Sequence, residues 1–469
     1  MPLFADASLL KQMRDVHVED LLLPLLIQLA IIIAVARVFA WLFRRMGQPA
    51  VVGEIAAGLV LGPSFLGWVA PQLFAMVFRP TIAELPPDAS DLMLSRVLTA
   101  LAQIGLILLL FLIGLEFDFG HLRYTGPAAL AISLAGVLLP FGLGIGLGTW
   151  MHGLVAPGIP WLSFVLFMGT SMSITAIPIL GRMMMEMGIT RTRIAAVTIS
   201  AAAVDDACGW ILLAAVAAAS RTTFSALQTG GMIVATVGFG LFMVFIARPI
   251  LARAARAALK AGGGELGLNS LAALFVLLFI CSIITNVIGI FAIFGAFLLG
   301  AILSEEHEFR DAVIRRLRDI VTAFFLPIFF AYTGLRTNIG SLETWQLWTL
   351  AGAVSFVAIL GKFGGCTLAA WLFGLRPREA ACVGIMMNTR ALMELIVINV
   401  GKDLGVIPDS VFCMLVLMAL LTTFMTTPIL LRLMRGTELE PYIRGSGFLG
   451  DQQQTADPLV EGAGGSSRA

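Results

Sequence analysis

Apolar stretches recur along most of this chain, separated by short segments that contain Gly, Pro or charged residues. Roughly 17 to 25 apolar residues can cross about 30 Å of hydrocarbon as an α-helix. The pattern therefore predicts an all-α polytopic membrane protein with about thirteen transmembrane helices between residues 21 and 434. The predicted helices lie at 21–43, 49–63, 95–116, 125–149, 160–186, 192–219, 226–250, 267–287, 289–304, 318–335, 345–374, 378–401 and 408–434.

Composition agrees with this pattern. The 469 residues are 59% hydrophobic and 13% charged, whereas soluble domains are about a quarter charged. The net charge of +1 gives no reason to expect a nucleic-acid partner, and we expect the lipid bilayer instead. The cysteines lie in apolar segments without Cys-x-x-Cys spacing, so we expect no disulfide framework, no zinc site and no cofactor: Cys208, Cys281, Cys366, Cys382 and Cys413.

Basic residues concentrate in alternate connections between the predicted helices. One set includes Arg253, Arg256 and Lys260, while the other connections hold few, such as Arg336 and Lys402. Because basic loops stay in the cytoplasm, we expect residues 1–20 outside, in the extracellular or periplasmic space, and the C-terminus inside. The chain is then a multi-pass protein of the cell's inner (plasma) membrane.

Two polar segments do not fit the predicted helices. Residues 304–319 are too polar to span, but Phe309, Val313 and Leu317 recur at helical spacing, so we expect a helix along the cytoplasmic surface. Residues 435–469 are expected to form a short disordered cytoplasmic tail.

A few charged residues fall at membrane depth. Each costs on the order of 2.5 to 3.5 kcal/mol at the centre of a spanning helix, so such residues face a cavity or a partner. The strongest candidates are Asp205, Asp206, Lys362, Arg390 and Glu394, with Glu54 in the short second helix.

The stretch "AAAVDDACGW" places Asp205 and Asp206 next to each other in an apolar helix. Lys362 lies equally deep and needs an anion. Adjacent helical residues project about 100° apart, so one aspartate can pair with Lys362 while the other faces a water-filled cavity. A static buried salt bridge beside a solvated spare carboxylate is the alternative.

Two segments have the character of broken helices. "GTSMSITAIPIL" sets Thr170, Ser171, Ser173 and Thr175 before Pro178, and an unwound helix here would free backbone carbonyls to coordinate a cation. A proline kink with hydroxyls bonded back to the preceding turn is the alternative.

"GIMMNTRALMELIVIN" interrupts the twelfth helix in the same way with Asn388, Thr389, Arg390 and Glu394. The fifth and twelfth helices differ by seven, and an odd shift reverses topology, as an inverted repeat requires. A simple pair between Arg390 and Glu394 within one helix remains the alternative.

These motifs resemble the monovalent cation:proton antiporters, most closely the second family, over residues 21–434. "GQPAVVGEIAAGLVLGPSFLG" is similar to the family's second helix, and "PIFFAYTGLRTNI" to its plant exchanger branch. The resemblance implies that Asp206 binds the transported monovalent cation and the proton, and that Asp205 pairs with Lys362. It places Thr170 and Ser171 at the crossover beside the ion. Potassium efflux members carry a Gln-Asp pair and a cytosolic nucleotide-binding domain, from which this chain departs.

The family also implies an inverted-repeat fold with two discontinuous crossing helices. It implies a homodimer with a mobile core, about residues 125–219 and 345–434, and a scaffold formed by the other helices. We expect a secondary active antiporter, not an enzyme, that exchanges K+ or Na+ for H+ by alternating access and is electrogenic. A cation channel and a sodium-coupled organic solute symporter are the alternatives. A membrane aspartyl protease needs two opposed aspartates, and here they are neighbours.

Overall fold

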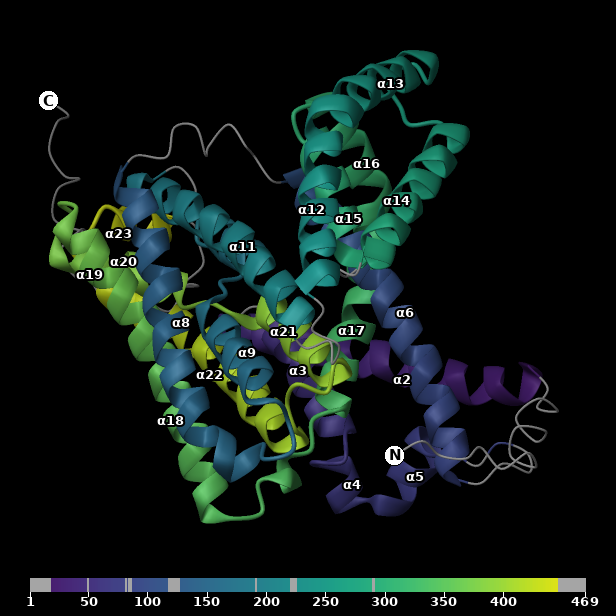
Figure 1. Cartoon of the computed structure of the whole chain (residues 1–469), viewed down its shortest axis with the longest axis vertical. Helices are drawn as coiled ribbons and strands as arrows, with labels where there is room; N and C mark the ends of the chain where they lie inside the picture. The colour runs from purple at the N-terminus through teal and green to yellow at the C-terminus, as the bar shows by residue number, and fades with distance from the viewer. Residues whose placement is uncertain are drawn as a thin grey trace, which may run out of the picture.

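The computed structural model describes residues 18–48, 50–80, 82, 87–116, 127–189, 192–219, 226–288 and 292–445. The ordered elements in these residues are helical (Figure 1). The N-terminal half contains α2 (Val18–Arg45), α3 (Ala50–Leu61), α4 (Leu66–Val69), α5 (Pro71–Phe78), α6 (Pro87–Glu116), α8 (Pro127–Val155), α9 (Trp161–Ser173), α10 (Ile177–Glu186) and α11 (Arg193–Ala219). The middle contains α12 (Ala226–Phe242), η1 (Met243–Ala247), α13 (Arg248–Ala261), α14 (Leu268–Ile288), α15 (Ala292–Leu303), α16 (His307–Ile320), η2 (Val321–Phe325), α17 (Leu326–Leu335) and η3 (Ile339–Ser341). The remainder contains α18 (Trp345–Ile359), η4 (Leu360–Gly364), α19 (Gly365–Leu372), α20 (Pro377–Met387), α21 (Ala391–Asp403), α22 (Asp409–Leu433) and α23 (Leu439–Gly445).

The predicted all-α polytopic architecture is confirmed. Among the described residues, nine helices are long and apolar enough to cross a membrane. The other four predicted segments are occupied by α9 with α10, by α11, by α15, and by α20 with α21. Thirteen crossings therefore remain a prediction, although helices lie where each was expected.

The helices pack as two groups (Figure 1). In the first, which we call the α3 group, α2–α6 pack with α12–α17 through pairs such as α3 with α17 and α6 with α15. In the second, the α8 group, α8–α11 pack with α18–α23 through pairs such as α8 with α19 and α11 with α20. The groups meet where α3 contacts α21 and α22.

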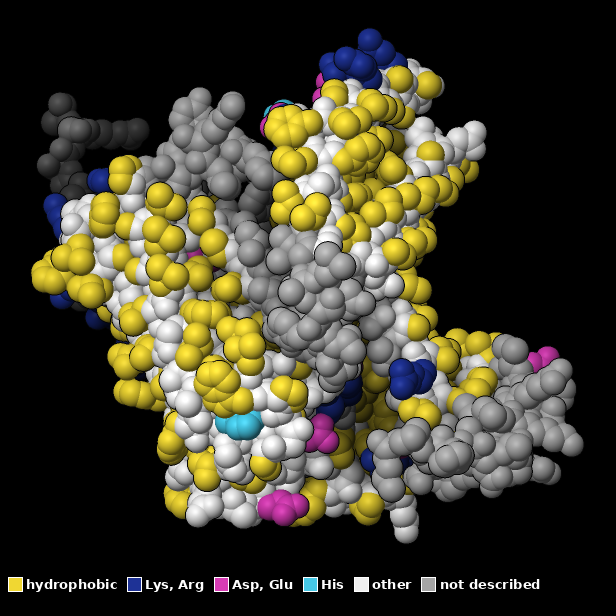
Figure 2. Space-filling view, viewed as in Figure 1, with side chains coloured by type: hydrophobic (Ala, Val, Ile, Leu, Met, Phe, Trp, Pro, Cys, Tyr) yellow, Lys and Arg dark blue, Asp and Glu magenta, His cyan; other side chains and the backbone are white. Residues whose placement is uncertain are grey.

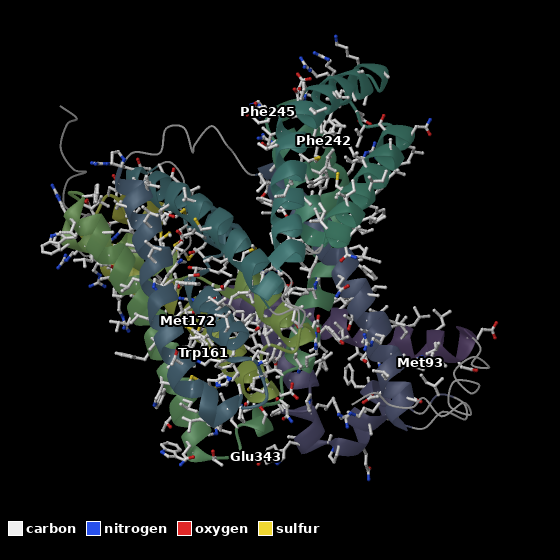
Figure 3. All side chains as sticks on the ribbon, viewed as in Figure 1. Met93, Trp161, Met172, Phe242, Phe245 and Glu343 are labelled. Carbon is white, nitrogen blue, oxygen red and sulfur yellow. The ribbon has the colours of Figure 1, made fainter. Side chains whose placement is uncertain are left out.

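The surface has an apolar belt and charged ends. Hydrophobic side chains cover much of the visible face, while Lys and Arg gather at one end, over α13 (Figure 2). Phe242 and Phe245 lie below α13 (Figure 3), and their side chains are 48% and 71% exposed. Glu343, between η3 and α18, lies at the opposite end (Figure 3). Large exposed apolar side chains between polar ends suit a lipid environment.

Two expectations about polar segments require correction. The segment at 304–319 is not a separate surface helix, because α16 continues through η2 into α17 without a break. Phe309, Val313 and Leu317 are buried there, since α16 packs against α6 and α13.

The start of the predicted tail is also ordered. Residues 439–445 form α23, and Leu439 and Ile443 are fully buried in the apolar cluster of the α8 group, which offsets the ordering cost. The rest of the tail, 446–469, and the N-terminal residues 1–17 lie outside the described residues.

Candidate functional site

The two discontinuous helices cross, as predicted. Helix α9 ends at Ser173 and α10 begins at Ile177, while α20 ends at Met387 and α21 begins at Ala391. The backbone N–H of Ala176, in the first break, donates to the carbonyl of Thr389, in the second, at 3.1 Å. Pro178 falls in the first turn of α10, where a missing N–H breaks no helical hydrogen bond.

Two buried cations bind the carbonyl end of α9. The last carbonyls of a helix have no partner within it and carry the negative end of its dipole. Lys362 Nζ donates to the carbonyl of Ser173 at 2.5 Å, and Arg390 Nη1 donates to that of Ser171 at 3.0 Å. Both side chains are fully buried. The break in α9 is therefore stabilised by one charge from η4 and one from the second break.

Asp205 of α11 forms the centre of the first polar cluster. Its Oδ2 lies 2.6 Å from Lys362 Nζ and accepts a hydrogen bond from Thr175 Oγ1 at 2.9 Å. Its Oδ1 accepts from Ser133 Oγ of α8 at 2.6 Å. All four side chains are buried. A buried carboxylate is tolerable here because a cation and two hydroxyls compensate both of its oxygens.

Lys362 reaches the cluster from a π-helical turn, η4, a geometry that is frequent at functional sites. Its ammonium donates three hydrogen bonds, to Asp205, to Ser173 and, at 2.9 Å, to the carbonyl of Gly136. An ammonium has three donors, so all are used. A Cβ on Gly136 would lie 2.7 Å from Cys366 Sγ and 3.4 Å from Asp205 Oδ2. Only glycine fits at this position without displacing a neighbour.

Arg390 and Glu394 form a second buried pair at the start of α21. Their closest charged atoms are 3.7 Å apart, and neither side chain is exposed. Ser171 Oγ donates to Glu394 Oε1, and Arg390 Nη2 donates to the carbonyl of Ala358 at 3.1 Å. The pair is more than an intrahelical contact, because both members also bind the end of α9.

The other predicted residues lie around the same crossing. Thr170 Oγ1 is bonded back to the carbonyl of Leu166 at 2.9 Å, as a hydroxyl inside a helix often is. Thr389 Oγ1 lies 3.4 Å from Thr426 Oγ1. Asn388 is buried, and neither atom of its amide has a hydrogen-bond partner among the described residues.

Asp206 is helical in α11, but its side chain lies outside the described residues, so its role stays a prediction. Asp206 follows Asp205 directly in this helix.

Sequence reasoning missed two members of the cluster, Ser133 and Gly136. Both lie on α8, one turn apart, and contribute a hydroxyl and a carbonyl. A polar residue one turn before a glycine in an otherwise apolar helix was the available signal. Among the described residues there is no group of three or more His, Cys, Asp or Glu that could hold a metal ion.

A helical membrane protein in which two broken helices cross beside buried ionisable side chains has the architecture of a secondary transporter. Residues 31–433 match the family model described as sodium/hydrogen exchanger, transmembrane. The chain therefore belongs to the sodium/hydrogen exchanger family of multi-pass membrane transporters.

Individual relatives agree with this assignment, and a solved structure has a similar fold. The chain is 40% identical to cation/H(+) antiporter 17 of Arabidopsis thaliana, over 87% of this chain and 48% of that protein. It is 37% identical to the Na(+)/H(+) antiporter NhaS4 of Synechocystis, over 88% of this chain and 97% of that one. The chain spans about half the length of the plant relatives. The fold is similar to that of the sodium proton antiporter MjNhaP1 of Methanocaldococcus jannaschii, with a TM-score of 0.57, 17% identity, and coverage of 92% of this chain and 99% of that one.

Proposed function

We propose that this protein is a secondary active antiporter, not an enzyme, that exchanges K+ or Na+ for H+ by alternating access. The observation that carries the proposal is the buried cluster of Asp205 and Lys362 at the crossing of two broken helices. Two neighbouring acids of α11 and a lysine at such a crossing suit a carrier that trades a proton for a cation. The names of the relatives, cation/H(+) and Na(+)/H(+) antiporters, support this choice.

In this mechanism Asp206 binds either the transported cation or a proton. Lys362 competes with the cation for oxygens, because its ammonium occupies the carbonyls of Gly136 and Ser173 and the carboxylate of Asp205. Loss of its proton frees these oxygens and leaves Asp205 charged next to the incoming cation. Two protons then leave for one cation that binds, so the cycle is electrogenic.

The α8 group is the mobile core of this mechanism, and the α3 group is the scaffold and dimer-forming part. The protein lies in the inner (plasma) membrane with its N-terminus outside and its C-terminus in the cytoplasm. This orientation is supported by the gathering of Lys and Arg over α13, at the end opposite Glu343 (Figures 2 and 3).

The test is cation-induced proton release from proteoliposomes that contain a pH-sensitive dye, with K+, Na+ and Li+ added in turn. The native chain should release protons with at least one cation, and Asp206→Asn should not. Asp311→Asn is the matched control, because it removes a carboxylate that is 52% exposed. Undiminished exchange by Asp206→Asn would exclude Asp206 as the binding carboxylate. A reversal potential that does not respond to membrane voltage would exclude electrogenic exchange.

A further inference from the structure

A cluster of polar contacts joins the two helix groups at the C-terminal ends of α17 and α21. Arg336 Nη2 donates to Asp403 Oδ1 at 2.7 Å, and Arg336 Nη1 to Asn399 Oδ1 at 3.2 Å. Asn399 Nδ2 donates to Thr333 Oγ1 at 2.9 Å, and Lys402 Nζ to the carbonyl of Arg336 at 3.3 Å. Two side chains of the α3 group thus meet three of the α8 group at one place.

The ion pair in this cluster differs from the other ion pairs of the described residues in that it joins the two helix groups. Where both partners are described residues, every other ion pair lies within one of the two groups. Arg336–Asp403 alone connects them among those pairs. A charged contact across two bodies resists their relative movement in a way that sliding apolar surfaces do not, because its geometry is directional.

Both sides of the cluster are anchored. On the α3 group, Tyr332 lies under Arg336, and its hydroxyl lies 2.8 Å from Thr99 Oγ1 of α6. On the α8 group, Lys402 pairs with Asp409 at the start of α22, at 2.9 Å. Any movement of α21 against α17 therefore pulls on contacts fixed to α6 and α22.

The cluster also has room to open. Arg336, Asn399 and Asp403 line a cavity of about 300 Å³ between α6, α14, α15, α17 and α21, with Ile396 and Gln103 in its wall. The side chains of Arg336 and Asp403 are 20% and 39% exposed. Water can therefore solvate both charges when they separate, so the contact is reversible at modest cost.

Helix α21 connects this cluster to the proposed ion site. Its N-cap residue, Arg390, binds the end of α9, and Asp403, its last residue, lies about 20 Å further on at 1.5 Å per residue. We propose that Arg336, Asp403, Asn399 and Thr333 form a latch that holds the α8 group against the α3 group in the conformation seen, and that it opens in every transport cycle. This inference rests on the proposed function, since alternating access requires the two groups to move.

The first test uses the full-length double variant Thr333→Cys/Asn399→Cys in proteoliposomes. The extent of cross-linking after oxidation is measured as the loss of free thiols. Cation/proton exchange should fall at least about tenfold after oxidation and return on reduction. The two single variants and the native chain, oxidised in parallel, control for the native cysteines. Full cross-linking with undiminished exchange overturns the latch. Absence of exchange by the native chain overturns the proposed function instead.

The second test does not depend on transport. An Ile396→Cys reporter, fully buried in the cavity wall, is labelled with a membrane-impermeant thiol reagent. Adding Arg336→Gln should raise the labelling rate roughly tenfold. This variant loses the hydrogen bonds of the charged guanidinium to Asp403 and Asn399, so the latch should open more often. Arg318→Gln is the matched control, since it removes a pair with Glu116 at 3.0 Å inside the α3 group. Equal labelling rates in the two variants overturn the latch.

Discussion

Replacement of Lys362 by Met tests whether the cluster at the crossing is a coupled charge pair. Met has nearly the length of Lys and removes the charge with little loss of packing. The change leaves Asp205 fully buried with two hydroxyl donors, Ser133 and Thr175, and no cation. Two carbonyls, of Gly136 and Ser173, also lose their donor.

The expected cost is about 3–5 kcal/mol in the free energy of unfolding, which is typical when one partner of a buried pair is removed. Asp205→Asn should cost a similar amount, because the Lys362 ammonium is then left charged with carbonyls alone. The double variant Lys362→Met/Asp205→Asn carries no buried charge at this position. Its loss in the free energy of unfolding should therefore be smaller than the sum of the two single losses by several kcal/mol, which is roughly the size of the pair interaction.

The measurement is the thermal unfolding of the four proteins in detergent, followed by tryptophan fluorescence. Lys402→Met is the control, because its pair with Asp409, whose side chain is 73% exposed, should contribute at most about 1 kcal/mol. If the losses of the two single variants add within about 0.5 kcal/mol, the residues are not coupled and the reasoning fails.

Three further predictions concern the neighbours of this pair and the last helix. Gly136→Ala should impair exchange, because its Cβ would lie 2.7 Å from Cys366 Sγ; Cys366→Ala should restore it, and Gly142→Ala, with open space around its Cβ, should change little. Failure of that rescue would show that the clash is not the cause. Ser133→Ala should lower the free energy of unfolding by about 1.5–3 kcal/mol, since it removes a hydrogen bond to the buried carboxylate of Asp205. An unchanged free energy of unfolding would contradict this hydrogen bond. A backbone hydrogen bond from Gly436, together with Arg444, lowers the pKa of Glu440. Its contribution to the docking of α23 is therefore present above the unfolded pKa of about 4.3 and is lost as the pH falls through the folded pKa, which hydrogen exchange of residues 436–445 would detect.

The positions of the helices were largely predictable because a single physical requirement dominates them. Hydrocarbon penalises an unpaired backbone group, so long apolar runs must be helical. The two breaks were predictable for a related reason, since hydroxyls, Pro178 and the charges at 388–394 interrupt otherwise apolar runs. The prediction of a surface helix at 304–319 was wrong, because the apolar side chains of this segment pack against other helices of the protein. Its polar residues therefore do not end the helix, which continues into α17.

The sequence by itself determined which residues carry an unusual energetic cost: Asp205, Asp206, Lys362, Arg390 and Glu394 stand out wherever the helices lie. Only the tertiary structure decided which of them meet. Lys362 is 157 residues from Asp205, and Arg336 is 67 residues from Asp403, and no local pattern encodes such contacts. The same holds for the carbonyls of Gly136, Ser171 and Ser173, because their chemistry is common to every residue and becomes distinctive only where a helix ends or a neighbour lacks a side chain.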